Sequence, residues 1–268
     1  MMSNSFIHPT AIVAEGATLG KNVKIGPYCI IGADVTLHDG VELVSHVSVD
    51  GITKVGKNTK IFPFASVGHQ PQDLKYAGEK SQLIIGENCT IRENATLNPG
   101  TKDGGMITSV GNNCLLMAGT HIAHDCRVGN NVIMANLSGL AGHCITGDYI
   151  TIGGMVVVHQ FVRIGSHAFI GAHSMVDADV IPYGMVIGNR AKLAGLNLVG
   201  LKRRKFKRDE IHTLRTAYRM FFSTEGTLRE RVEDASNLFS NSNLVKDVAD
   251  FINSSERSIC LPRNGGSN

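Results

Sequence analysis

Two histidines and an aspartate stand close together in the stretch HIAHDC, residues 121–126: His121, His124 and Asp125. His143 follows Asp125 by 18 residues. An imidazole titrates near neutral pH and is the commonest general base in proteins. A carboxylate beside it can hold the ring in one tautomer, and several histidines at one place can alternatively bind zinc. The residues therefore suggest acid–base catalysis or a metal site, provided that the fold brings them together.

The surrounding chain repeats with a period of six residues. Stepping by six from Ile7 to Val67 meets only apolar residues, and the register resumes at Ile85 and again at Val110. This period fits neither an α-helix nor an alternating strand. It fits short strands joined by tight corners, three of which make a coil of 18 residues. We predict a parallel β-helix over residues 1–188, with outward loops near 69–82 and 100–109, where the register is interrupted.

Stacking of such coils predicts how the polar residues meet. Residues 18 apart lie one above the other, about 4.8 Å apart. Two adjacent columns result, one of His124, Gly142 and Gln160 and one of Asp125, His143 and Phe161. His121 and His159 fall within three positions of them. We therefore expect His124 to act as general base, Asp125 to orient it, and the backbone N–H of Gly142 to donate to an oxyanion, as acyl transfer requires.

The repeat also explains most of the cysteines. Five of the six occupy the small fifth position of the repeat, namely Cys29, Cys89, Cys114, Cys126 and Cys144. We interpret them as small interior residues, without disulfides or a metal. Cys126 is adjacent to Asp125 but should point inward, so it is not a candidate nucleophile.

The pattern changes after residue 188, and we predict a helical domain over residues 189–268. Apolar residues at helical spacing predict a helix over 209–223. The stretch TLRE, residues 227–230, is a capping box that opens a second helix. A third helix is expected near 244–252.

Charge and targeting signals limit the possible partners. The net charge is +3, and the stretch KRRKFKR, residues 202–208, holds six of the 26 basic residues. The other 20 face 23 acidic residues, so we expect an anion site or a solvated basic face there rather than a nucleic-acid interface. No stretch reads as a signal peptide or a membrane span, and a cytoplasmic protein is expected.

The residues above resemble the hexapeptide-repeat acyltransferases, whose coils are left-handed. Longer motifs resemble one family among them, the UDP-N-acetylglucosamine O-acyltransferases that open lipid A synthesis in Gram-negative bacteria. These motifs are QDLKYAGE (72–79), HIAHDC (121–126), LAGH (140–143), IGGMVVVHQF (152–161), GLN (195–197) and GLKRR (200–204). The implied fold is an all-β left-handed parallel β-helix with a C-terminal α-helical domain.

The resemblance implies transfer of a 3-hydroxyacyl chain from acyl carrier protein to the 3-hydroxyl of UDP-N-acetylglucosamine, without a cofactor. It implies a homotrimer with active sites between subunits. His124 matches the family's base, Asp125 its partner and Gly142 the oxyanion donor. The positions that match substrate contacts are Gln72, Asp73, Lys75, His121, His143, His159, Gln160, Asn197, Arg203 and Arg204.

The sequence departs from the family pattern in places. Val199 stands where an acidic uridine contact can occur, and Ala172 and Arg190 stand where the family gauges acyl length. The methyl group of Ala172 predicts an acyl chain of about C12 to C14, since one methylene is worth only about 1 kcal/mol.

Three alternatives stay open. The first is N-acyl transfer to a 3-amino sugar nucleotide. The second is a zinc hydratase of the γ-carbonic-anhydrase type, with His121, His124 and His143 as ligands. The third is a non-catalytic solenoid that only binds partners.

Overall fold

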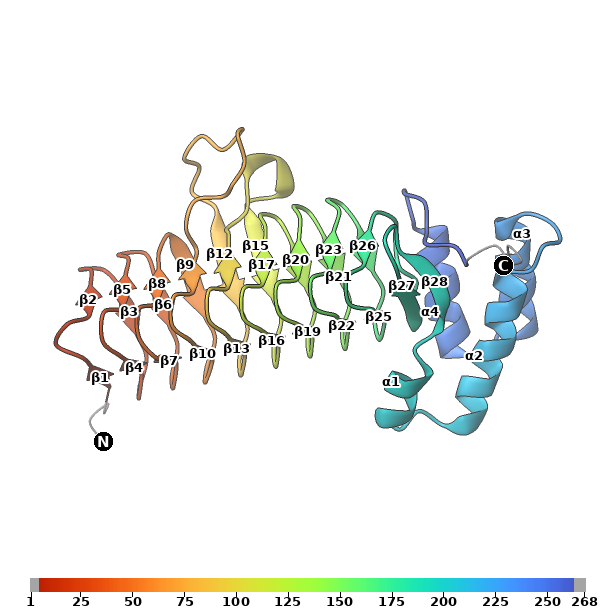
Figure 1. Ribbon diagram of the computed structural model, residues 1–268, viewed down its shortest axis with the longest axis horizontal. Helices are drawn as coiled ribbons and strands as arrows, with labels where there is room; N and C mark the ends of the chain where they lie inside the picture. Colours follow the sequence, from red (N-terminus) through yellow and green to blue (C-terminus); the bar gives the residue numbers. More distant parts are fainter. Residues whose placement is uncertain (1–4, 263–268) are drawn as a thin grey trace.

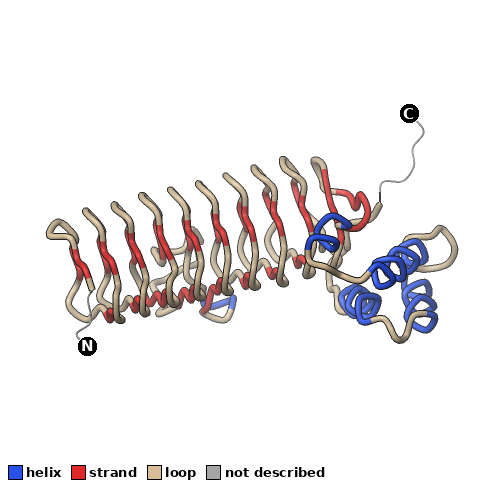
Figure 2. Tube along the Cα trace, turned by 90° about the horizontal axis from the view of Figure 1, so that it is seen from below, coloured by secondary structure: helices blue, strands red, loops and turns tan. Residues whose placement is uncertain are grey.

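The computed structural model describes residues 5–262. The chain winds into a row of three-sided coils stacked along one axis, and a group of helices lies beyond the last coil (Figures 1 and 2). Every pairing within the coils is parallel and joins one coil to the next. Residues one coil apart are therefore hydrogen-bonded neighbours, as in Thr96↔His121 and His121↔Gly139.

The three faces of the coils are three sheets. The first contains β1 Phe6–Ile7, β4 Lys24–Ile25, β7 Glu42–Leu43, β10 Lys60–Ile61, β13 Thr90–Ile91, β16 Leu115–Leu116, β19 Ile133–Met134, β22 Thr151–Ile152, β25 Phe169–Ile170, β27 Gly184–Ile187 and β28 Lys192–Leu196. The second contains β2 Ile12–Val13, β5 Ile30–Ile31, β8 Ser48–Val49, β11 Ser66–Val67, β14 Thr96–Leu97, β17 His121–Ile122, β20 Gly139–Leu140, β23 Val157–Val158 and β26 Met175–Val176. The third contains β3 Thr18–Leu19, β6 Thr36–Leu37, β9 Ile52–Val55, β12 Gln82–Ile85, β15 Ile107–Val110, β18 Arg127–Val128, β21 Ile145–Thr146 and β24 Arg163–Ile164.

The apolar register forms the interior of the coils. From Ile25 onward the sixth-position residues are buried, and so are the five cysteines at the fifth position. The first coil differs, since Ile7 is 45 % exposed and Val13 and Leu19 are only partly buried. No further coil covers the side chains of Ile7, Val13 and Leu19. The buried interior therefore begins with the second coil, although the repeat begins with the first.

The corners of the coils explain much of the remaining sequence. Many corner residues adopt positive φ, which most side chains avoid, and asparagine holds several of these positions, for example Asn22, Asn58 and Asn131. Aromatic residues and histidines occupy others and stack on one another, as Tyr28, His46 and Phe64 do. Asp125 and His143 also belong to this set, with φ of 60° and 63°.

Two loops project from the same side of the β-helix (Figure 1). The first connects β11 to β12, and the second connects β14 to β15 and contains a short 3-10 helix, Lys102–Gly104. The second loop ends earlier than predicted, because β15 begins at Ile107 and pairs with β12 over four residues, from Gln82↔Ile107 to Ile85↔Val110. These longer strands form the base from which both loops rise.

The C-terminal part is helical: α1 Leu198–Arg203, α2 Arg208–Phe221, α3 Leu228–Leu238 and α4 Asn243–Asn253. The three predicted helices correspond to α2, α3 and α4, and Thr227 opens α3 with the expected capping box to Glu230. Two elements lack a sequence signal. These are α1, which contains part of the basic stretch, and β28, which pairs antiparallel with β27 across the predicted boundary at residue 188.

The chain returns to the β-helix after α4. Asp179 is fully buried, and its carboxylate accepts hydrogen bonds from the backbone N–H of Arg163 at 2.8 Å and from the hydroxyl of Ser255 at 2.7 Å. The guanidinium of Arg163 also donates to Ser254. These bonds tie the end of the helical part to the last coils. Within residues 5–262, no helix has both the length and the apolar content needed to cross a membrane.

Candidate active site

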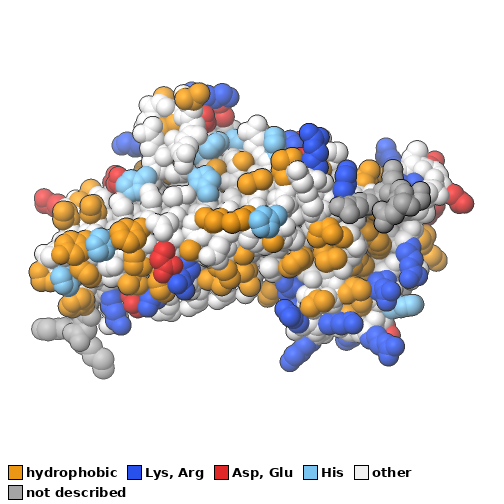
Figure 3. All heavy atoms as spheres, viewed as in Figure 1, with side chains coloured by type: hydrophobic (Ala, Val, Ile, Leu, Met, Phe, Trp, Pro, Cys, Tyr) orange, Lys and Arg blue, Asp and Glu red, His pale blue; other side chains and the backbone are white. Residues whose placement is uncertain are grey.

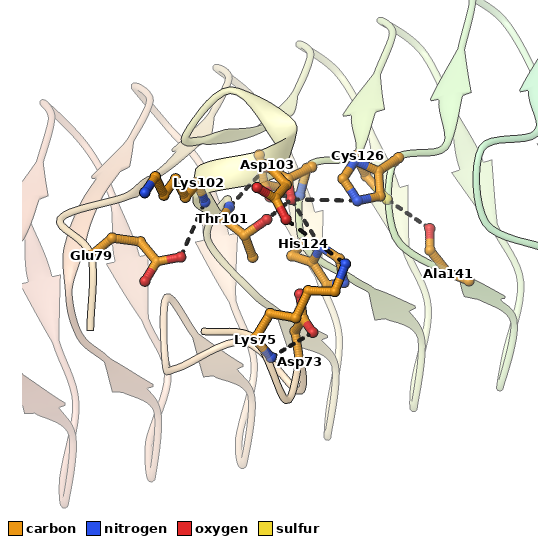
Figure 4. A network of polar contacts seen from close by, with 12 residues as sticks. Asp73, Lys75, Glu79, Thr101, Lys102, Asp103, His124, Cys126 and Ala141 are labelled. Atoms are coloured by element: carbon orange, nitrogen blue, oxygen red, sulfur yellow. Dashed lines mark hydrogen bonds and ion pairs between the residues drawn. The ribbon is translucent and has the colours of Figure 1, made fainter. Parts of the chain in front are cut away.

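His124 and Asp125 form a hydrogen-bonded pair at one corner of the coils; His124 is labelled in Figure 4. Nδ1 of His124 lies 2.8 Å from Oδ2 of Asp125, whose side chain is fully buried. An ionised carboxylate only accepts hydrogen bonds, so Nδ1 carries the proton. The lone pair of the ring is then on Nε2, which no described hydrogen bond uses. The pair has the arrangement of a general base with its orienting carboxylate.

The second loop holds the carboxylate of Asp125. Thr101 donates to it twice, from its backbone N–H to Oδ1 at 2.8 Å and from its hydroxyl to Oδ2 at 2.6 Å. The backbone N–H of Asp125 in turn donates to the hydroxyl of Thr108 at 2.7 Å. Gly104 lies so close that a Cβ there would come within 1.9 Å of Cγ of Asp125. The sequence did not reveal these residues, because they lie outside the repeat.

Gly142 lies directly against the imidazole of His124, in the column that the repeat predicts. A Cβ at Gly142 would fall 2.6 Å from Cε1 and 2.7 Å from Nε2 of His124. Glycine is therefore required for the ring to keep its place. Among the described residues, no group accepts a hydrogen bond from the backbone N–H of Gly142. This N–H is therefore free to bind an oxyanion close to the base.

His143 lies above Asp125, also as predicted. Its ring meets that of His124 edge-on at 5.1 Å and stacks on Phe161 at 4.4 Å. Its Nε2 is 3.9 Å from the same Oδ2 that binds His124. Burial lowers the pKa of His143, and the carboxylate of Asp125 acts in the opposite direction.

A cavity of about 380 Å³ opens beside His124. Its wall includes Gln72 of the first loop, Asn98, His121 and Gly142. Nδ1 of His121 is bonded to the hydroxyl of Thr96 at 2.7 Å, and burial, followed by nearby His124, lowers the pKa of His121. Figure 3 shows histidine side chains on this face at the base of the projecting loops.

Asn98 is a second residue that the sequence did not reveal. It is buried, and its amide Nδ2 donates to the carbonyls of His69 and Gln70, where the first loop begins. Its Oδ1 has no hydrogen-bond partner among the described residues. Asn98 thus anchors the first loop and brings an unused acceptor to the cavity wall.

Cys126 is directed away from the cavity. Its thiol is buried and donates to the carbonyl of Ala141 at 3.1 Å (Figure 4). Contact with the thiol of Cys144, together with burial, raises the pKa of Cys126 well above its ordinary value. A thiol in this state is a poor nucleophile, in agreement with its inward position in the repeat.

Comparisons with known proteins match the chain over nearly its whole length. Hexapeptide-repeat models match residues 1–33, 16–51 and 107–142, and a model of the hexapeptide repeat of succinyl-transferases matches 161–195. The model of domain 2 of UDP-N-acetylglucosamine O-acyltransferases matches residues 179–260. The acyl-[acyl-carrier-protein]–UDP-N-acetylglucosamine O-acyltransferase of Rickettsia canadensis is 54 % identical over 97 % of this chain and 98 % of its own length. That of Rhizobium johnstonii is 48 % identical over 97 % of this chain and 96 % of its own length.

This chain belongs to the UDP-N-acetylglucosamine O-acyltransferase family. Solved structures of the family superpose on the acyltransferase over nearly its whole length. The protein from Moraxella catarrhalis has a TM-score of 0.92 at 42 % identity and covers 96 % of this chain and 99 % of its own. The protein from Francisella novicida has a TM-score of 0.93 at 38 % identity, with 97 % and 95 % covered. The predicted fold class, a left-handed parallel β-helix with C-terminal helices, is confirmed.

The remaining predicted substrate contacts of the acyltransferase lie at different distances from the cavity. Asp73 and Lys75 lie on the first loop, where the carboxylate of Asp73 accepts from the N–H of Lys75, and Nζ of Lys75 is 3.8 Å from Asp103 of the second loop. His159 and Gln160 are exposed on the coil above Gly142 and are not part of the cavity wall. Their roles stay predictions.

Two of the three residues predicted to bind the nucleotide, Asn197 and Arg204, form hydrogen bonds within the chain. Asn197 caps α1 by accepting from the N–H of Gly200 and donates to the carbonyl of His167. Arg204 donates to the carbonyl of Tyr149 at 2.5 Å, and burial lowers its pKa. Arg203 is exposed. Binding of a nucleotide by these three residues stays a prediction.

The two residues predicted to gauge acyl length lie further along the axis. The outward side chains of the second sheet form a column that leads from the cavity toward them, through His121, Gly139, Val157 and Met175. Ala172 and Arg190 are both exposed, and the N–H of the residue after Arg190 donates to the carbonyl of Met175. They flank the far end of this column, and their role stays a prediction.

The ligand set of the zinc alternative differs from the one that the structure brings together. The described groups within metal-binding reach are His124, Asp125 and His143, whose ligand atoms lie within 4.8 Å of one another. His121 is not among them, and its Nδ1 is bonded to Thr96. Within one chain the three histidines of the predicted triad are therefore not brought together, and Nδ1 of His124 is already bonded to Asp125.

Proposed function

We propose that the chain transfers a (3R)-3-hydroxyacyl group from acyl carrier protein to the 3-hydroxyl of UDP-N-acetylglucosamine, the first step of lipid A biosynthesis. The names of the relatives, which match over nearly the full length, support this donor and acceptor. Their names specify transfer to oxygen, which favours the hydroxyl over a 3-amino group as acceptor. The observation that carries the proposal is the His124–Asp125 pair with Gly142 at the edge of the cavity.

The reaction begins with removal of a proton. Nε2 of His124 accepts the proton of the sugar 3-hydroxyl as its oxygen attacks the thioester carbonyl of the donor. The carboxylate of Asp125, bonded to Nδ1 at 2.8 Å, stabilises the imidazolium that forms. His124 activates the hydroxyl directly, so no covalent enzyme intermediate is required.

The second half of the reaction uses the same groups. Attack gives a tetrahedral intermediate whose oxyanion accepts from the backbone N–H of Gly142. When the intermediate collapses, the carbon–sulfur bond breaks and the thiol of the carrier leaves with the proton from His124. The products are the 3-O-acylated sugar nucleotide and the free carrier thiol, and the base is restored.

Substrate contacts are proposed for the cavity wall and the first loop. Gln72, His121 and His143 are close to the base, while Asp73 and Lys75 extend from the loop above it. Asn197, Arg203 and Arg204 are proposed to bind the uridine and phosphate groups at the helical end, where basic side chains gather (Figure 3).

We also propose a homotrimer with its sites between subunits. The cavity is bounded by one set of coils and the loops of the same chain, and exposed His159 and Gln160 are available to complete the site of a neighbour. Because the proposed carrier and sugar nucleotide are water-soluble, a cytoplasmic location is part of the proposal. Sedimentation analysis of the purified protein tests the trimer.

The experiment that tests the proposed function is one assay with graded donors. Purified protein is incubated with UDP-N-acetylglucosamine and 3-hydroxyacyl carrier proteins of about C10 to C16, and acylated sugar nucleotide is measured by mass spectrometry. We expect product with an optimum near C12 to C14, because the methyl group of Ala172 narrows the groove by about one methylene. Absence of product with every donor, in protein of native thermal stability, would refute the proposal.

A further inference from the structure

The second loop contains a residue whose contacts all converge on the catalytic pair. Thr101 is buried, with 3 % of its surface exposed. Its backbone N–H and its hydroxyl donate to the two different oxygens of Asp125, at 2.8 and 2.6 Å. Figure 4 shows Thr101 on this loop, beside Lys102 and on the side toward His124. Because each oxygen of the carboxylate accepts one of these hydrogen bonds, the carboxylate cannot rotate without losing one of them.

These two hydrogen bonds are important because two imidazoles lie near the same oxygen of Asp125. Oδ2 of Asp125 is 2.8 Å from Nδ1 of His124 and 3.9 Å from Nε2 of His143. A modest rotation of the carboxylate would exchange one partner for the other. His124 would then lose the group that orients it, while Asp125 would still have a partner.

The loop that contains Thr101 is itself held in place. Its carbonyl accepts from the N–H groups of Gly104 and Met106 at 3.2 and 3.0 Å. Glu79 of the first loop accepts from the N–H of Lys102 at 3.1 Å and from that of Ala77 at 2.8 Å. Its own backbone N–H, followed by those of Ala77 and Lys102, lowers the pKa of Glu79. The exposed Lys75–Asp103 ion pair also joins the loops, but such pairs contribute little.

We propose that Thr101 is a positioning residue for acyl transfer, which directs the carboxylate of Asp125 to His124 rather than to His143. The inference rests on the proposed function, in which His124 is the base. Bonds to a buried carboxylate are charge-assisted, and they are the strong ones. The hydroxyl of Thr101 and the imidazole of His124 share Oδ2, so loss of the hydroxyl changes how firmly this oxygen holds the proton on His124.

The kinetic test compares Thr101→Val with Thr101→Ser. Valine keeps the shape and the backbone donor but removes the hydroxyl, and we expect kcat to fall about 10- to 100-fold, as for loss of a hydrogen bond to a charged group. KM for the sugar nucleotide should not change. Serine keeps the hydroxyl and should restore most of kcat. Thr59→Val is the matched control, because the buried hydroxyl of Thr59 donates to Gly86 far from the cavity.

The pH dependence separates positioning from a merely structural role. In Thr101→Val the carboxylate turns partly toward His143, so the imidazolium form of His124 loses stabilisation and the acid limb of kcat/KM should move to lower pH. The other ionisable groups that face this pair are His121 and His143, with Asp73 and Asp103 acting on His143 from the loops. None of these four residues is substituted in the variant.

A measurement without substrate keeps the inference distinct from the proposed function. In histidine-labelled full-length protein, the ring nitrogen signals of His124, assigned with His124→Gln, report its tautomer and titration. We expect a single tautomer with the proton on Nδ1 in the native chain, and a mixed population and a lowered midpoint in Thr101→Val. If the native protein acylates no sugar nucleotide, the proposed function fails, and these signals still decide the role of Thr101.

Three results would overturn the inference. The first is a valine variant with native kcat and an unmoved acid limb. The second is a fall in kcat with an unmoved acid limb and unchanged His124 signals, which would indicate a structural role alone. The third is a serine variant with the kcat, acid limb and His124 signals of the valine variant, which would show that the hydroxyl does not orient Asp125.

Discussion

His143 and His167 occupy the same position of the six-residue repeat at two different corners of the coils, and their surroundings make them different groups. Both have φ of 63°, and both stack on an aromatic ring, His143 on Phe161 and His167 on Tyr149 at 5.0 Å. His143 faces a carboxylate and a second imidazole. His167 has a second tyrosine, Tyr183, on its other side, and its Nδ1 has no partner among the described residues.

The difference shows that the corner position alone does not produce a chemical site. Burial, followed by the positive charge of Arg204, lowers the pKa of His167 to about 4, so this ring is neutral and serves as a packing element. At the other corner, Asp125 opposes the effect of burial on His143. A loop outside the repeat supplies two hydrogen-bond donors to this buried carboxylate.

The largest effect is expected at the base. His124→Ala should lower kcat by about 10²- to 10⁴-fold, the usual contribution of a general base, while circular dichroism and the Tm stay close to native, because the interior is untouched. The control is His46→Asn, at a corner far from the cavity, since asparagine adopts the same positive φ elsewhere in this fold. Near-native turnover of the His124 variant would remove this residue from the mechanism.

A smaller loss is expected when the ring of His124 is displaced but kept. Gly142→Ala puts a methyl group 2.6 Å from the imidazole, and a displacement of about 1 Å can cost about 10²-fold in rate. Gly154→Ala is the matched control, because the nearest atom to its new methyl group is 3.4 Å away. Steady-state kinetics of both variants test this, and equal rates would show that contact between Gly142 and the ring is unimportant.

The contrast between His143 and His167 is tested by replacing each of them with phenylalanine. His143→Phe keeps a stacked ring but removes the ring nitrogens proposed to contact the substrate, and we expect kcat/KM to fall about tenfold, as for one lost hydrogen bond to the substrate. His167→Phe keeps the aromatic stack and should leave kcat unchanged. If both variants lose activity equally, the corners do not differ in the way that their contacts indicate.

The smallest effect is on stability at low pH. The folded pKa of His167 is about 4, against 6.5 for a free histidine, so the unfolded chain takes up the proton first as the pH falls. The contribution of His167 is therefore complete above pH 6.5, and stability is lost progressively as the pH falls toward 4. His167→Phe should lose less Tm than the native chain over this window in calorimetry. An identical pH dependence in both proteins would contradict the buried neutral state of His167.

Much of the fold is predictable because the repeat determines it locally. A six-residue period places one apolar side chain inside at each strand, and an 18-residue coil places His143 above Asp125 and Gly142 above His124. Both columns were predicted in this way, and the family resemblance supplied the hand of the coils. The pattern could not reveal α1 or β28, since α1 is only six residues long and the pairing of β28 with β27 is antiparallel and outside the period.

The sequence by itself determined the coil, the columns and the pairing of a histidine with its neighbouring aspartate, because each follows from the period. Only the tertiary structure decided that Thr101, 24 positions before Asp125, donates hydrogen bonds to its carboxylate and that Asn98 anchors the first loop. It also decided that Nδ1 of His121 bonds to the hydroxyl of Thr96. The physical reason is that a loop outside the repeat has no register. Its residues reach the site only through the loop's own turns and hydrogen bonds, and no spacing in the sequence encodes where these place a donor.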